Sequence, residues 1–285
     1  MARGLNSVNL VGTLTQAPEM RYTANGLAIL ELNVAGNDHV VGSDGQEREL
    51  AWYHRVSLFG NQAEMMADQL NAGDPVFIDA RLNFRSWETP EGQRRSMLSL
   101  NANRVERVTY GTRSDQPTVQ DARGQDRLRF ALNEARIIGN LTRDAELRYT
   151  PSGDAVLGLS VAVNERYRDR SGQDQESTHF VDVDLWRELA EASADLQKGA
   201  PVFVTGRLKN DSWTDREGNQ RRTTKIEASR IEFLTRGSES GGSGTPAGGG
   251  GRSQPAASPN PPAPAPSESR LDIDEEFPPE EDLPF

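Results

Sequence analysis

The chain contains two copies of one sequence pattern, about 127 residues apart. Residues 133–153 repeat the plan of residues 6–26, and the run Arg-Tyr-Thr at 21–23 recurs unchanged at 148–150. After one deleted residue the offset becomes 126, and the matching register continues to Trp87 and Trp213. Solenoid repeats have periods of only about 20–50 residues, so a period this long indicates two whole domains in tandem.

Length and composition narrow the class of protein. The 285 residues leave roughly 105–110 residues for each copy, which is enough to bury its own core. The absence of cysteine excludes disulfides, thiolate zinc sites and cysteine nucleophiles. The first residues lack the apolar run of a signal peptide, and no apolar segment is long enough to span a bilayer. We therefore expect a cytoplasmic protein with no membrane partner.

The net charge of −11 is unevenly distributed, and residues 237–285 account for −7 of it. The remaining residues therefore carry only −4. Of the 32 basic residues 29 are Arg, which can stack on bases as well as pair with phosphate. The acidic total thus does not exclude a nucleic-acid partner, although solvent-exposed arginines without a ligand would give the same composition.

Hydrophobic periodicity predicts the same elements in both copies. In copy one, alternation predicts strands at about 7–14, 27–35, 51–59, Val76–Trp87 and 95–107, with a short helix at Gln62–Leu70. The second helix is expected at Arg187–Leu196. Turn residues before Gly45 and Gly172 predict the tip of a long hairpin in each copy. Glycines inside the first strand, Gly12 and Gly139, suit the bends of a small closed barrel.

Three strands, one helix and two strands is the element order of an OB-fold, a five-stranded barrel. The predicted fold class is therefore all-β with one short helix per domain, arranged as two tandem OB-folds, although periodicity alone also allows another small all-β barrel. We expect OB-fold 1 at 1–110, a linker at 111–131 that either stays apart or folds against one domain, and OB-fold 2 at 132–236. A Gly/Pro/Ser/Ala-rich disordered segment follows at 237–270, and an acidic tail at 271–285.

Side-chain parity on the third strand separates a core face from an exposed face. His54, Val56 and Leu58 share the predicted core face, whereas Tyr53 and Phe59 lie on the other. The same alternation recurs in copy two. Aromatic side chains alternating with Arg on an exposed sheet face are suited to stacking on bases, and each stacked base contributes about 1–3 kcal/mol whatever its identity. The alternative is that these rings cap the barrel or pack on a protein partner.

Enzymatic functions have little support. The three histidines are isolated and show no zinc-binding spacing, and no Gly-rich phosphate-binding loop with Lys is present. Asp182 and Asp184 lie on one strand face and can in principle ligate Mg²⁺, but the matching positions in copy one are Arg55 and Ser57. We predict no catalysis, no cofactor and no metal.

Specific motifs resemble a known family. The opening Leu-Val-Gly-x-Leu-Thr with Pro-Glu-x-Arg-Tyr-Thr-x-x-Gly, the run His-Arg-Val-Ser-Leu-Phe-Gly at 54–60, and the terminal Asp-Leu-Pro-Phe are similar to bacterial single-stranded DNA-binding proteins (SSBs). The tandem arrangement resembles the Deinococcus–Thermus form, with two OB-folds in one chain. The resemblance implies sequence-independent binding of single-stranded DNA in replication, recombination and repair, as a cytoplasmic, nucleoid-associated homodimer.

The resemblance also implies site residues. The family's base-stacking aromatics fall on Tyr53, Phe59, Trp87, Tyr167, Phe180, Trp186 and Trp213. The rest of the predicted DNA-binding set is Arg21, Tyr22, Arg55, Arg81, Arg85, Arg148, Tyr149, Arg207 and Lys209. One stacking tryptophan of single-domain relatives falls near His39, which weakens that contact. The tip Asp282, Leu283, Pro284 and Phe285 resembles the docking peptide for replication, recombination and repair proteins, although a solubilising terminus is the alternative.

The two copies are not expected to hold DNA in the same way. Asp182 and Asp184 on the exposed face of copy two repel phosphate, whereas copy one has Arg55 and Ser57 there. We therefore expect copy one to bind with the steeper salt dependence, because counterion release follows the number of phosphates neutralised. An OB-fold scaffold that binds only proteins and an RNA-binding OB protein are the alternatives; loss of tryptophan quenching by oligo-dT would favour the first, and tighter binding of poly-U than of poly-dT the second.

Overall fold

The computed structural model describes residues 4–42, 45–89, 92, 94–108, 118–120, 124, 126–128, 131–168, 172–214 and 220–234. These residues fall within one compact unit, Met1–Thr235. Copy one consists of β1 (Asn6–Leu14), β2 (Glu19–Tyr22), β3 (Ala28–Val41), β4 (Glu47–Phe59), α1 (Asn61–Ala67), β5 (Pro75–Glu88) and β6 (Arg94–Arg107).

Copy two repeats this order with β9 (Leu132–Leu141), β10 (Glu146–Tyr149), β11 (Ala155–Arg168), β12 (Asp174–Trp186), α2 (Arg187–Ala192), β13 (Pro201–Thr214) and β14 (Gln220–Phe233). The predicted strands and helices are confirmed, and both helices end earlier than expected. The short strands β2 and β10 were not predicted, because four residues are too few to show a period. The long hairpins are confirmed by pairing that extends from Ile29–Phe59 to Val41–Glu47 in copy one.

Each copy closes into a five-stranded barrel. In copy one the hydrogen-bonded order is β1-β5-β6-β4-β3, and β3 returns to β1 at Thr13–Ala35. In copy two the order is β9-β13-β14-β12-β11, and β11 returns to β9 at Val161–Leu141. The pairs β4–β6 and β12–β14 are parallel, and the other barrel pairs are antiparallel. This closure confirms two OB-folds.

Glycine allows the first strand of each barrel to cross its neighbour closely. A Cβ atom at Gly12 would lie 2.6 Å from the carbonyl oxygen of Ala35, and one at Gly139 would lie 2.4 Å from that of Ala162. Real side chains do not tolerate such distances, so any larger residue would push the two strands apart. The predicted role of both glycines at bends of the barrel wall is thus explained by close backbone approach.

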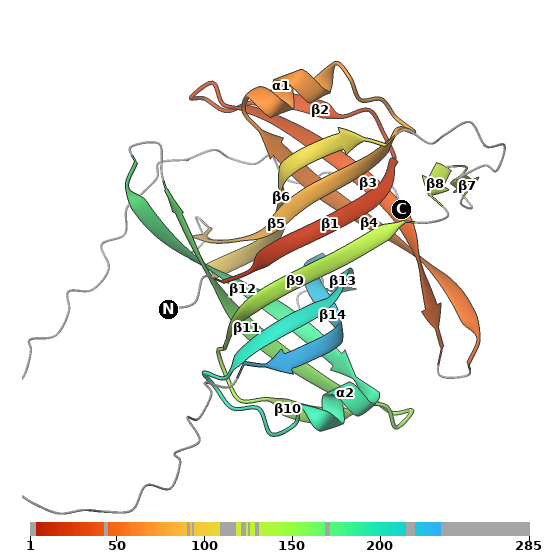
Figure 1. Cartoon of the computed structure of the whole chain (residues 1–285), viewed down its shortest axis with the longest axis vertical. Helices are drawn as coiled ribbons and strands as arrows, with labels where there is room; N and C mark the ends of the chain where they lie inside the picture. Colours follow the sequence, from red (N-terminus) through yellow and green to blue (C-terminus); the bar gives the residue numbers. More distant parts are fainter. Residues whose placement is uncertain are drawn as a thin grey trace, which may run out of the picture. The chain divides into compact units, whose positions relative to one another are not determined.

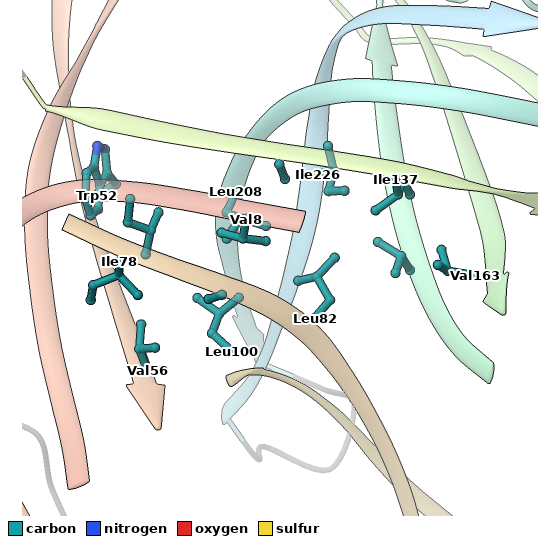
Figure 2. Packing of buried hydrophobic residues seen from close by; sticks show 14 of the residues in the cluster. Val8, Trp52, Val56, Ile78, Leu82, Leu100, Ile137, Val163, Leu208 and Ile226 are labelled. Carbon is teal, nitrogen blue, oxygen red and sulfur yellow. The ribbon is translucent and has the colours of Figure 1, made fainter. Parts of the chain in front are cut away.

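The buried apolar side chains of both barrels form one continuous cluster. Alternate residues of each barrel strand enter it, so β4 and β12 share the same burial pattern over their last eight residues, down to Phe59 and Trp186. Figure 2 shows Val8, Ile78 and Leu100 pointing into this cluster from the strands of copy one. Fully burying such a side chain contributes about 1.5–3 kcal/mol, so the parity that builds the core also places the other residues of each strand outside.

The two barrels are joined edge to edge by β1 and β9. These strands pair antiparallel from Asn6–Ile137 to Val11–Leu132, and they lie side by side in Figure 1. Asn6 and Asn133 make equivalent contacts near this seam. Each amide side chain receives a backbone N–H and donates to the carbonyl of one residue in its own copy, Leu82 or Leu208.

Part of the predicted linker folds against copy one. It contains β7 (Thr118–Gln120) and β8 (Asp126–Leu128), and β8 pairs with β3 at Gly36. Leu128 is fully buried there. The domain boundaries themselves remain predictions. In the described part of the chain, neither helix has the length and apolar character that a membrane crossing requires.

Candidate nucleic-acid interface

Aromatic side chains are exposed on the outer surface of both barrels. We define the copy-one face by Tyr53, Arg55 and Phe59 of β4 with Trp87 of β5, and the copy-two face by Phe180, Asp182, Asp184 and Trp186 of β12. The exposed fractions of the rings are 45% for Tyr53, 37% for Phe59, 46% for Trp87, 43% for Phe180 and 36% for Trp186. Large apolar rings left this exposed at matched positions offer flat surfaces on which bases can stack.

Strand parity explains why these rings stay outside. On β4, Trp52, His54, Val56 and Leu58 are buried, so the residues between them must face outwards. The same alternation on β12 buries His179, Val181, Val183 and Leu185. Two hydrophobic interiors with the same register therefore produce two outer faces with rings in the same places.

On the copy-one face a buried carboxylate holds two arginines. Glu31 of β3 is only 4% exposed, and its oxygens lie 3.0 Å from Arg21 Nη2 and 3.0 Å from Arg55 Nε. Ser57 Oγ donates to the same carboxylate at 2.9 Å. Because Arg55 remains half exposed, the cluster presents positive charge to solvent beside the rings while its negative charge is shielded below.

The copy-two face has a different ionic arrangement. The position that matches Glu31 is Gly158, where an added Cβ would meet nothing within 4 Å. Lys225 Nζ lies 3.3 Å from Asp184 Oδ2 and 3.5 Å from Asp211 Oδ2. Partial burial opposes the charge on Lys225, but attraction to Asp184 and Asp211 outweighs it and raises the pKa of this lysine. Lys225 therefore neutralises one of the two carboxylates that were expected to repel phosphate.

Asp182 is the other carboxylate that was expected to repel phosphate, and its surroundings differ from those of Asp184. It is exposed, and among the described residues it has no ion-pair partner. Lys209, a predicted DNA contact, lies 3.2 Å from Asp211. The copy-two face thus carries exposed rings over a nearly neutral set of ionic side chains, with one uncompensated negative charge.

Arg81 and Arg207 were predicted to contact DNA, but the structure pairs both at the junction between the copies. Arg81 Nη1 lies 2.8 Å from Glu165 Oε1 of copy two. Arg207 lies 2.7 Å from Glu227 and 3.4 Å from Asp38 of copy one. Each arginine thus has one ion-pair partner in the other copy, Glu165 for Arg81 and Asp38 for Arg207, and its contact with DNA stays a prediction. Sequence reasoning did not find these pairs across the seam, because Glu165 and Asp38 each belong to the other copy.

Two histidines also lie at the junction, in contrasting environments. His54 is buried, and burial lowers its pKa to about 4 against the weaker opposing effect of a backbone hydrogen bond with Leu208. His179 lies with its Nε2 3.3 Å from Glu165 Oε2. The hydrogen bond with His179 lowers the pKa of Glu165; partial burial opposes that shift, and Arg81 adds to it. One histidine is therefore kept neutral by its surroundings, and the other faces a carboxylate.

The remaining predicted DNA-binding residues are distributed as follows. Tyr22 and Tyr149 are 60% and 62% exposed, Arg148 pairs with Glu146 at 2.8 Å, and Arg85 is exposed on β5. The side chains of Tyr167 and Trp213 lie outside the described part of the structure, as do the tail residues Asp282, Leu283, Pro284 and Phe285. His39 Nε2 lies 4.0 Å from Glu49 Oε1, so its ring has a polar neighbour.

Two functional candidates on these faces were not found from the sequence. In the sequence, Glu31 has the pattern of an ordinary polar residue of a strand. Lys225 lies on the last strand of copy two, away in the sequence from the strand that carries the rings. Comparing the two copies position by position would have found the first, because Glu31 aligns with a glycine. Among the described residues, no three His, Asp or Glu side chains are grouped as metal ligands.

Known proteins are similar to this chain in both sequence and fold. The pattern of the Single-strand binding protein family matches residues 5–108 and 132–234. The chain is 47% identical to a single-stranded DNA-binding protein of Deinococcus radiodurans and 50% identical to one of Thermus aquaticus, in each case over 100% of both chains. The crystal structure of the wild-type Thermus aquaticus single-stranded DNA binding protein matches with a TM-score of 0.64 and 43% identity, covering 85% of this chain and 98% of that one.

Proposed function

Because the chain belongs to the Single-strand binding protein family, in its two-OB-fold Deinococcus–Thermus form, we propose that it binds single-stranded DNA without regard to sequence and carries out no catalysis. The observation that supports this most is the set of exposed rings at matched positions of both barrels. Every base has a flat aromatic surface, so stacking on rings gives affinity that does not depend on sequence. Arginines beside the rings add attraction to the phosphates.

Titration of the full chain with oligo-dT, followed by quenching of tryptophan fluorescence, tests the proposal. Trp87→Ala and Trp213→Ala should each weaken binding by about 1–3 kcal/mol if each ring holds one base. Met65→Ala is the control, since Met65 is 64% exposed but lies on α1. Unchanged affinity in a folded Trp87→Ala/Trp213→Ala chain would contradict the assignment. Tighter binding of poly-U than of poly-dT would indicate an RNA-binding protein instead.

The proposed biological role is protection of single-stranded DNA during replication, recombination and repair, with partner enzymes recruited through the C-terminal tip. Leu283 and Phe285 next to a run of carboxylates form a short apolar anchor with acidic steering towards a basic pocket. Deletion of 282–285 should abolish capture of replication and repair enzymes and leave oligo-dT affinity unchanged. Retention of those enzymes by the truncated chain would place the docking surface on the barrels.

The proposed assembly is a homodimer, which would present four OB-folds to DNA. It rests on the resemblance to the two-OB-fold Deinococcus–Thermus form. Sedimentation equilibrium should give twice the 31.4 kDa chain mass. A monomer or a tetramer at micromolar concentration would contradict this assembly.

A further inference from the structure

The junction between the copies brings an aromatic ring of copy one against the copy-two face. The rings of Phe84 on β5 and Phe180 on β12 have centroids 5.3 Å apart and planes at 79°. This edge-to-face geometry is one that aromatic pairs prefer, and it contributes beyond simple burial. Phe180 nevertheless remains 43% exposed, so its outer surface is available while Phe84 contacts it from the side.

The backbone around this ring pair is also fixed across the junction. The N–H of Phe84 donates to Nδ1 of His179 at 3.1 Å, and His179 precedes Phe180 on β12. The other ring nitrogen of His179 lies 3.3 Å from Glu165, and Glu165 holds Arg81 at 2.8 Å. The backbone N–H of Phe84 and the side chains of three residues from the two copies therefore fix the position of β5 against β12 beside the ring pair.

The second junction, related to the first by the internal repeat, has no such ring. The residue that matches Phe84 is Asn210, and its side-chain amide donates to the backbone oxygen of Tyr53 at 2.6 Å. A hydrogen bond to a backbone oxygen fixes the strand but does not support the Tyr53 ring. The position that carries an aromatic contact to the copy-two face at Phe84 thus carries a polar contact to β4 at Asn210.

We propose that Phe84 is a positioning residue for DNA binding, contributed by copy one to the copy-two face. It holds the Phe180 ring in the orientation that receives a base. A DNA strand stacked on Phe180 then lies on a surface that both copies build, and the copies bind as one unit at this junction. This inference rests on the proposed function and goes beyond it, since it assigns part of one binding face to the other barrel.

A double-mutant cycle in the full chain tests the coupling, with fluorescein-labelled oligo-dT as the probe. We expect Phe180→Ala to weaken binding about tenfold, as loss of one stacked base would, and Phe84→Leu to weaken it about three- to fivefold. The double variant should be no weaker than Phe180→Ala alone, because Phe84 acts only through Phe180. Phe84→Tyr keeps an aromatic edge and should retain wild-type affinity. Melting curves check that every variant folds.

The matched control is the other junction, where Asn210→Ala and Tyr53→Ala should give losses that multiply. Losses that also multiply for Phe84 and Phe180, or an unchanged affinity of folded Phe84→Leu, would overturn the inference. Should Phe84→Leu fail to fold, Phe84→Met supplies the same cycle with a flexible side chain of similar size. A wild-type chain that does not bind oligo-dT would overturn the proposed function itself, which separates the two failures.

Discussion

The two copies present rings at the same places but differ in how they hold charge beside them. In copy one, Glu31 lies under two arginines; in copy two the same position is Gly158, and Lys225 pairs with Asp184 from another strand. Ring positions follow from strand parity, which the core enforces in both barrels. Ionic contacts need only a few side chains to match, so they differ between copies without disturbing the fold.

The junction shows the same contrast. His54 of copy one aligns with Val181 of copy two, and His179 of copy two aligns with Trp52. The ring of Trp52 stacks on that of His54 at 5.3 Å, whereas His179 faces Glu165. The backbone pairing of β1 with β9 is common to both sides of the seam, and the polar contacts around it differ from one side to the other.

The largest expected effect comes from removing the rings of one copy at a time. A chain with Tyr53, Phe59 and Trp87 changed to Ala, and one with Phe180, Trp186 and Trp213 changed to Ala, should each lose about 3 kcal/mol or more of oligo-dT binding. We expect the copy-two variant to lose more binding free energy, because the copy-two face has less net positive charge to attract phosphate once its rings are removed. Fluorescence anisotropy with labelled oligo-dT measures this, and a larger loss for the copy-one variant would reverse the comparison.

The second expected effect, of comparable size, is a fall in the free energy of unfolding at low pH that comes from the junction containing His54. His54 has a pKa of about 4 in the folded chain and about 6.5 when unfolded, so as the pH falls the unfolded state takes up this proton first. Stability from the neutral histidine is present above about pH 6.5 and is lost towards pH 4, by about 3 kcal/mol in total.

His54→Val introduces the residue found at the matching position of copy two and should remove that loss. Urea unfolding at pH 7 and at pH 4.5 measures the difference. His39→Gln is the matched control, because it removes a histidine whose side chain is half exposed instead of the buried one. The same pH dependence in His54→Val and wild type would show that His54 is not responsible.

A smaller effect should follow from exchanging the ionic features of the two faces. Glu31→Gln removes the negative charge under Arg21 and Arg55, so we expect tighter oligo-dT binding at low salt and a salt slope steeper by about 0.7. Gly158→Glu adds a carboxylate where the structure leaves space, beside Asp184, and should weaken binding. Glu64→Gln removes a charge on α1 and serves as the control; weaker binding by Glu31→Gln would instead mean that Glu31 chiefly orients the arginines.

The smallest expected difference is in salt dependence between the faces. The chain that keeps only its copy-one rings should show a slope of log affinity against log salt steeper by about 0.7, or one phosphate, than the chain that keeps only its copy-two rings. The full chain is preferable to separate pieces at 1–111 and 128–237, because each piece would lose the β1–β9 pairing. Equal slopes, or a steeper slope for copy two, would contradict this interpretation of Asp182.

The barrels and the ring positions could be predicted from the sequence, because both depend on the alternation of apolar and polar residues along each strand. The core residues Val56 and Leu58 and the exposed residues Tyr53 and Phe59 follow from the same period of two. The sequence did not reveal that Arg81 pairs with Glu165, because residues far apart in the chain meet only after both barrels have closed. The role of Glu31 could not be predicted for a similar reason, because its burial under Arg21 and Arg55 depends on the packing of three strands.

The seam between the barrels forms late during synthesis of the chain, because its two strands lie far apart in the sequence. Asn6 pairs with Ile137, so β1 emerges from the ribosome about 130 residues before its partner strand. At roughly 5–20 residues per second, the edge of β1 waits for about 7–26 seconds. An unpaired strand edge is a template for pairing with any neighbouring chain. Until β9 emerges, pairing of this edge with a neighbouring nascent chain therefore competes with the intramolecular pairing of β1 and β9.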